Sequence, residues 1–155
     1  MMTTAETRLA SAGIELPPAV TPFGPYVPAV QTGRLLFLSG MIPTVGHQPL
    51  FVGRVGSELN LEQGRAAARA ATLNALAVVK AQLGSLDTVT RVVKLGVYIV
   101  TGDAPIDLIH VADGASELLR DVFGEDKLPV RLVFAVAALP LGLHVEIEVV
   151  FELAA

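Results

Sequence analysis

Two charged residues in an otherwise apolar C-terminal stretch are the strongest candidates for chemistry in this sequence. Arg131 begins a β-prone run directly after an apolar Leu-Pro-Val segment, where a permanently charged guanidinium needs a protein carboxylate or an anionic ligand as its partner. Glu146 lies on the polar face of the next predicted strand. Two interpretations stay open here: an ordinary cross-strand ion pair between Arg131 and Glu146, or a site in which Arg131 binds a substrate carboxylate while Glu146 positions or activates a water.

The other residue types that commonly carry chemistry show no supporting pattern. His47, His110 and His144 fall in a predicted loop, helix and strand, without metal-ligand spacing. The chain has no cysteine, which excludes thiol catalysis, disulfides and thiolate metal sites. Nucleotide-binding and serine-hydrolase motifs are missing, and the GxxG match at Gly53–Gly56 lacks the flanking helices of a KH domain. We therefore expect no metal and no cofactor that such motifs would hold.

The composition predicts a folded domain that associates with copies of itself. Of 155 residues, 52% are hydrophobic and 17% charged, which favours one domain with a complete core. The longest apolar run, Leu132–Leu143, is interrupted by Pro140 and is shorter than the roughly 18 residues of a membrane span. A mean hydropathy of +0.60 is high for a non-membrane protein of this size. We expect a homo-oligomer that buries the excess apolar surface.

The charge pattern and the first residues exclude further classes. Eleven basic and 15 acidic residues give a net charge of −4 without a basic stripe, which disfavours nucleic acid as a partner. The start of the sequence lacks the basic-then-apolar order of a signal peptide. We therefore expect a cytoplasmic protein with neither a membrane nor a nucleic-acid partner.

The N-terminal part, residues 1–23, is predicted as a short helix and an extended arm. Thr3 and Glu6 have the spacing of a capping box, and Gly13 would end the helix. The following proline- and glycine-rich stretch is too interrupted for a helix or a central strand. The main domain is expected to cover residues 24–155.

The first half of that domain reads as a hairpin, a loop and a long helix. Residues 26–30 and 34–39 form two β-prone runs, and residues 40–59 form a loop with a strand fragment at 50–52. Asn60 and Gln63 predict the capping box of a helix that ends at Gly84. The face expected to pack on the sheet comprises Ala66, Ala70, Leu73, Leu76 and Ala77.

The second half adds a central strand, a helix and two strands. A strand over residues 88–100 is apolar on both faces, and a helix from Asp103 to Gly124 carries one apolar stripe. Strands follow at 131–138 and 144–153, the last alternating Glu146, Glu148 and Glu152 with apolar residues. The order predicts an α+β fold with a mixed sheet and two main helices on one face.

An ordered set of short motifs resembles the YjgF/RidA family, also called endoribonuclease L-PSP. The similarity covers about residues 24–153. The motifs that carry it are Gly24-Pro25-Tyr26, Leu38-Ser39-Gly40-Met41-Ile42-Pro43, Asn74, Val92-Val93-Lys94, Val97-Tyr98, Leu128-Pro129-Val130-Arg131, Leu139-Pro140 and Val145-Glu146-Ile147-Glu148.

The resemblance implies a chorismate-mutase-like α+β fold, a homotrimer, and a ligand pocket in each cleft between subunits. It also implies an enamine/imine deaminase that hydrolyses reactive 2-imino acids, such as 2-aminoacrylate, to 2-keto acids and ammonia without a metal or organic cofactor. Arg131 matches the carboxylate-binding arginine and Glu146 the water-orienting glutamate. Tyr26, Ser39 and Gly40 match pocket residues. The family's helix-borne asparagine falls near Asp113, across a one-residue gap.

Two departures and three alternatives accompany this hypothesis. Met41 stands where family members commonly have glutamine, and the stretch between Pro43 and the long helix is longer than in compact members. One alternative is a trimeric protein that binds 2-keto acids without chemistry. Ribonuclease action is a second alternative, which the acidic composition opposes. Chorismate mutase activity is a distant third.

Overall fold

The last strand, β7 (Val145–Leu153), shows most clearly how the sequence determines the sheet. In the computed structural model, which describes residues 3–155, every second residue of β7 is buried, from Val145 to Leu153. The alternate residues, Glu146 among them, lie on the other face. One face of the sheet therefore belongs to the core, and the other is open.

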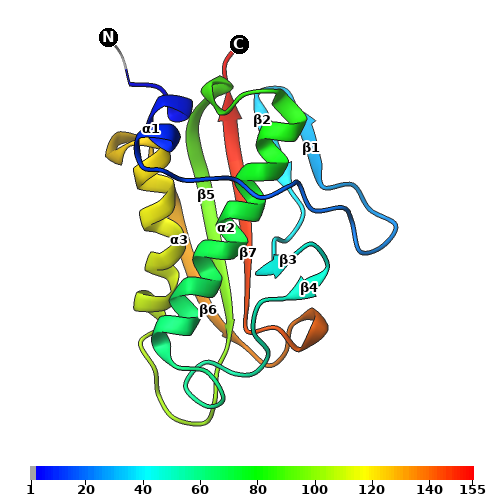
Figure 1. The fold of residues 1–155 in the computed structure, drawn as a ribbon, viewed down its shortest axis with the longest axis vertical. Helices are drawn as coiled ribbons and strands as arrows, with labels where there is room; N and C mark the ends of the chain where they lie inside the picture. Colours follow the sequence, from blue (N-terminus) through cyan, green and yellow to red (C-terminus); the bar gives the residue numbers. More distant parts are fainter. Residues whose placement is uncertain (1–2) are drawn as a thin grey trace.

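The sheet has five strands in the order β1-β2-β7-β5-β6. The additional strands are β1 (Ala29–Thr32), β2 (Leu35–Leu38), β5 (Val89–Val100) and β6 (Val130–Val136). Only β5 and β6 pair in parallel, and the other neighbours are antiparallel. The parallel pair requires a crossover, and the helix between these two strands provides it across the covered face of the sheet (Figure 1).

Two long helices, α2 (Leu61–Leu83) and α3 (Leu108–Phe123), cover one face of the sheet (Figure 1). Helix α2 begins as predicted: the Asn60 side chain accepts from the backbone N–H of Gln63, whose side chain accepts from the N–H of Asn60. It ends at Gly84, which has a left-handed φ of 82°. The predicted α+β fold with a mixed sheet and two main helices on one face is confirmed.

The two long helices approach each other closely at a glycine. A side chain at Gly114 of α3 would collide with the backbone carbonyl of Arg65 in α2. The stripe predicted for α3 is buried at Val111, Ala115 and Leu118. The small residue lets these apolar side chains reach the shared core.

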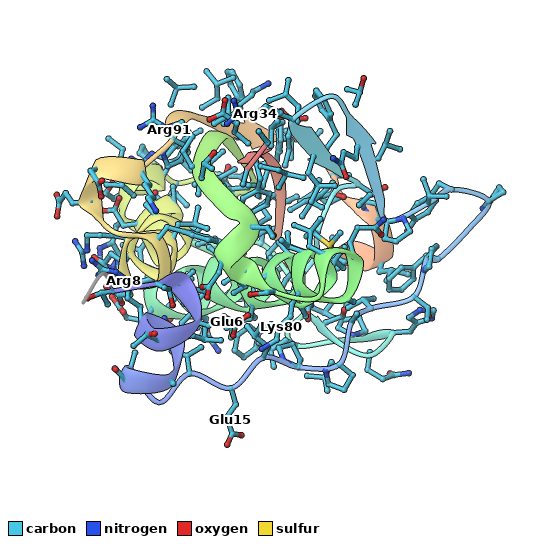
Figure 2. The ribbon with its side chains drawn as sticks, turned by 90° about the horizontal axis from the view of Figure 1, so that it is seen from above. Glu6, Arg8, Glu15, Arg34, Lys80 and Arg91 are labelled. Atoms are coloured by element: carbon cyan, nitrogen blue, oxygen red, sulfur yellow. The ribbon has the colours of Figure 1, made fainter. Side chains whose placement is uncertain are left out.

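The short helix α1 (Ala5–Ser11) is fastened to the end of α2. The Glu6 carboxylate accepts from Lys80 Nζ and from the backbone N–H of Leu86, both at 2.9 Å. The N–H of Glu6 donates to Asp87 at 2.9 Å. Figure 2 shows Glu6 and Lys80 pointing toward each other, whereas Glu15 points away from the fold. The arm then crosses the outside of α2 to reach β1 (Figure 1).

Several predicted boundaries were wrong by a few residues. Thr4, rather than Thr3, caps α1, so Glu6 is free to bind Lys80. Asp107, rather than Asp103, caps α3 by accepting from the N–H of His110. The loop after β2 holds a small hairpin, β3 (Thr44–Val45) and β4 (Gln48–Pro49), in place of a strand at 50–52.

Two predictions about packing were also wrong. The face predicted for α2 was wrong in part. Leu76 and Ala77 are buried as predicted, but Ala66 is exposed and Ala70 only partly buried, because α2 turns Ala67, Ala68 and Ala71 toward the core. Strands β6 and β7 are not neighbours, since β5 lies between them. A cross-strand contact between Arg131 and Glu146 is therefore impossible within one chain.

The open face of the sheet is largely apolar. It exposes Val30, Phe37, Leu132 and Phe134, and Tyr98 of β5 stacks on Phe134 at a centroid distance of 6.1 Å. Helices cover only the opposite face (Figure 1). These apolar side chains lie toward the two edges of the sheet, on β1–β2 and on β6, and the Lys94–Glu148 ion pair lies on the strands between them. Exposed apolar side chains in such number are typical of an interaction face.

Candidate active site

A cavity of about 530 Å³ lies beside the N-terminal end of β7. Its walls come from four parts of the chain: the arm at residues 20–28, the loop at 39–44, helix α2 at Asn74, and the turn at 140–141. Glu146 completes the lining from β7. Four residues named from the sequence, Tyr26, Ser39, Gly40 and Glu146, therefore surround one space.

Glu146 is the acidic residue that lines this cavity. It pairs with Tyr98 across the sheet and is partly buried. Burial raises the pKa of the Glu146 carboxyl above its ordinary value of 4.5, because removal from water disfavours the charged form. A carboxylate of raised pKa is a stronger base once it is ionised.

Gly40 leaves the space that the Glu146 carboxylate occupies. A Cβ built on Gly40 would collide with Oε1 of Glu146 and would lie 3.0 Å from its Cδ. The neighbouring Met41 fixes this approach, because its backbone exchanges two hydrogen bonds with Ile147, of 2.8 and 2.9 Å. The absence of a side chain at position 40 is thus a requirement of the site.

Ser39 links the arm to the segment that follows β2, and Tyr26 stabilises a turn within the arm. The Ser39 hydroxyl donates to the carbonyl of Val27 at 2.6 Å. The Tyr26 hydroxyl accepts from the backbone N–H of Phe23 at 3.0 Å. Both side chains line the cavity, and both also define the course of the chain that encloses it.

Arg131 and Asp113 lie together, away from this cavity. Arg131 pairs in register with Leu95, on the face covered by the helices, whereas Glu146 is on the open face. Its Nη1 donates to Asp113 at 2.8 Å and to Ser116 Oγ at 3.0 Å. The predicted need for a partner is met by a carboxylate, but by Asp113 of α3 rather than by Glu146. The Arg131 side chain remains 26% exposed at the edge strand.

Two polar residues at the cavity were not among the predicted site residues. Asn74 is 3% exposed and donates from Nδ2 to the carbonyls of Ile42 and Thr44, both at 2.9 Å. Thr44 is 4% exposed, and within residues 3–155 its hydroxyl has no hydrogen-bond partner. Asn74 is one of the residues that carry the family resemblance, and an asparagine on a buried helix face is itself a signal. Thr44 gives none in the sequence.

The histidines do not gather into a site. His47 stacks on Phe23, His110 bonds to Glu62 at 2.7 Å, and His144 is fully buried beside Phe51. Across residues 3–155, no group of three or more acidic or histidine side chains could hold a metal ion. Among the same residues, no helix is both long and apolar enough to cross a membrane.

A family model matches almost the whole chain. Residues 6–153 match the family described as "YjgF/chorismate_mutase-like, putative endoribonuclease". Curated relatives include Protein TCP17 of Trypanosoma cruzi, 39% identical over 94% of this chain and 92% of that protein. Protein HMF1 of Saccharomyces cerevisiae is 32% identical over 81% of each.

Solved structures share the same architecture. A protein from Shewanella oneidensis MR-1, described as a "putative endoribonuclease", is 33% identical, covers 97% of this chain and 99% of its own, and superposes with a TM-score of 0.91. RidA from Psychrobacter sp. PAMC 21119 is 30% identical over 87% of this chain and 94% of its own, with a TM-score of 0.60. Escherichia coli TdcF, solved with bound serine, is 29% identical over 88% and 94%, with a TM-score of 0.58.

Proposed function

Because this chain belongs to the YjgF/chorismate-mutase-like family, we propose that it hydrolyses reactive 2-imino acids, such as 2-aminoacrylate after its tautomerisation, to 2-keto acids and ammonia. The observation that carries the proposal is the Glu146 carboxylate, partly buried in the cavity wall with a raised pKa and a side-chain-free Gly40 beside it. The serine bound to the structural relative TdcF supports a small ligand related to an amino acid.

In the proposed reaction, Glu146 acts as a general base and then as a general acid. The carboxylate accepts a proton from a water whose oxygen bonds to C2 of the imine, and the C=N electron pair moves to nitrogen. The resulting carbinolamine takes the proton back on nitrogen. Glu146 then accepts the hydroxyl proton of the carbinolamine and passes it to the amine nitrogen. Ammonia leaves as the C–N bond breaks and the carbonyl forms, so Glu146 ends in its starting state.

Arg131 supplies the charge that would bind the substrate carboxylate, and we place it on a neighbouring copy of the chain. Only its Nη1 is engaged by Asp113 and Ser116 within residues 3–155, so Nε and Nη2 remain available for a carboxylate. Its position on the edge strand suits a contact with another subunit. The exposed apolar face of the sheet supports a homotrimer in which each cleft joins one Arg131 to one Glu146.

The test is turnover of imines generated by an L-amino-acid oxidase, with trapping by semicarbazide as the readout. The protein should lower the trapped fraction, and Arg131→Ala and Glu146→Gln should each strongly reduce this effect while leaving a measurable residual rate. Arg120→Ala, an exposed arginine on α3, is the matched control and should keep full activity. Unchanged trapping with the unmodified protein over several imines would exclude the activity.

A mixing experiment tests the shared site separately. Arg131→Ala and Glu146→Gln chains, unfolded together and refolded, should recover about a quarter of the normal activity, because half of the chains retain each group and every site needs one of each. No recovery would mean that both groups act from one chain. A protein that binds 2-keto acids tightly without any turnover would instead be a non-catalytic binder.

A further inference from the structure

The cavity is larger than the proposed smallest substrates require. A volume of about 530 Å³ lies within the range of pockets that hold ligands well beyond three carbon atoms. Gly40 contacts Glu146, and the loop then continues to Thr44, whose carbonyl accepts from Asn74 of α2. The cavity therefore extends from the proposed reaction centre along this loop to α2.

The walls of the extension are apolar and uncharged. Phe23 and Pro25 come from the arm, Met41 and Ile42 from the loop, and Leu141 from the turn before β7. Among the described residues, Glu146 is the only charged side chain that lines the cavity. A second carboxylate on a substrate would find no cation there, and an ammonium would find only the base itself.

The inner end of the cavity offers neutral hydrogen-bonding groups. Thr44 lines the cavity and its buried hydroxyl has no partner in residues 3–155. Asn74 uses its amide nitrogen on Ile42 and Thr44, so its Oδ1 is the atom left for a ligand. A buried hydroxyl without a partner is unfavourable until a ligand or a water satisfies it. This observation points to a bound group at that end.

The wall formed by the arm is held in place before any ligand arrives. His47, in the turn between β3 and β4, has its Nε2 3.0 Å from the Thr21 hydroxyl and 2.9 Å from the Thr21 carbonyl. Its ring stacks on Phe23 at 4.0 Å. A wall fixed by two elements can select a shape, because little rearrangement is needed on binding.

From these contacts we infer that the cavity contains a side-chain subsite for 2-imino acids whose side chain is uncharged and mainly apolar and ends in a hydrogen-bonding group that Thr44 meets. The inference rests on the proposed function. The glutamine-derived imine ends in such a group, and the methionine-derived imine carries a weaker acceptor, its thioether sulfur, one methyl group before the end. The norleucine-derived imine has a similar length without the polar end, and the glutamate-derived imine has a charged one.

The test compares kcat/KM for the imines of alanine, norleucine, methionine, glutamine and glutamate. The methionine and glutamine imines should exceed the alanine imine by roughly tenfold or more, and the glutamate imine should fall below the glutamine imine by a similar factor. Equal values for glutamine and glutamate, or a preference for alanine, would overturn the subsite.

Thr44→Val is the decisive variant because it removes the hydroxyl at nearly constant volume. The glutamine-to-norleucine ratio of kcat/KM should fall by about three- to tenfold, which is the usual effect of one hydrogen bond. Thr44→Ser should restore the ratio. Thr72→Val is the matched control: Thr72 is a buried threonine of α2 that donates to Ala68 and does not line the cavity, so the ratio should stay unchanged. An unchanged ratio in Thr44→Val would refute the role of Thr44.

A binding measurement separates this inference from the proposed chemistry. If no imine is hydrolysed, the proposed function fails, and calorimetric titration with 2-oxohexanoate and 4-methylthio-2-oxobutanoate still tests the subsite. Tighter binding of the thioether, lost in Thr44→Val, would support the subsite in a binding protein. Equal affinities for both keto acids would overturn it.

Discussion

Adding one methyl group at position 40 should displace the proposed base, Glu146, without changing its carboxylate group. Gly40 has no left-handed φ, so alanine fits the backbone, yet its Cβ would overlap Oε1 of Glu146. The carboxylate must move by roughly 1 Å to reach ordinary contact distance, and a displacement of that size costs about 10²-fold in rate, or about 2.7 kcal/mol of transition-state stabilisation. We predict a loss of that order in kcat/KM for Gly40→Ala.

The assay is the semicarbazide competition described above, made in a double-mutant cycle with Glu146→Gln. If Gly40→Ala acts only by displacing the carboxylate, it should cause almost no further loss in the Glu146→Gln background. A thermal melt should show that Gly40→Ala leaves the fold intact. A full 100-fold loss in both backgrounds would refute this reasoning, as would normal activity of Gly40→Ala.

Four further outcomes follow from charges and caps. The acid limb of kcat/KM against pH should lie above 4.5, because burial raises the pKa of Glu146 and only its ionised form accepts a proton; Glu146→Gln should lose this limb. Asp113→Asn should tighten binding of 2-oxobutanoate by roughly three- to tenfold in calorimetric titrations, since an exposed carboxylate no longer competes for Arg131. Burial lowers the pKa of His144 to about 4 from 6.5, so the unfolded chain binds more protons than the folded chain between these pH values. The free energy of unfolding, measured by urea denaturation, should therefore fall by about 2 kcal/mol from pH 7 to pH 5. The His144→Leu variant should not show this fall. Asn60→Ala should lower that free energy by about 1 kcal/mol and Tm by roughly 2–4 °C, through loss of the cap of α2.

Local signals predicted the elements well where a few neighbouring residues determine the structure. Asn60, Gln63 and Gly84 define α2 at both ends, and the alternation around Glu146 defines β7, because caps and pleats depend on residues close in sequence. The cap of α3 was predicted wrongly for the opposite reason: residues distant in sequence determine it. Asp103 and Asp107 are both suitable caps, but Ile106, which lies between them, packs closely against Gly56 of the preceding loop, and the helix starts only after it.

Relations between distant segments could not be predicted from the residues alone. Helix α2 carries a run of alanines, so its sequence has no sharp apolar stripe, and contact between Gly64 and Val55 determines which alanines are buried. The insertion of β5 between β6 and β7 separates Arg131 from Glu146, and strand order depends on long-range pairing. The resemblance did bring Tyr26, Ser39, Gly40 and Glu146 together, whereas Thr44 became visible only through its burial.

The close contact between α2 and α3 at Gly114 also affects Arg131, the proposed substrate-binding residue on the edge strand. Gly114 stands between Asp113 and Ser116, the two residues that orient Arg131, and it sets how closely α3 approaches Arg65. A larger residue there would shift the helix and both hydrogen-bonding groups with it. A substitution at Gly114, which contacts no ligand, would then change the affinity of Arg131 for anions. Altered substrate preference in a variant therefore need not arise from residues that line the cavity.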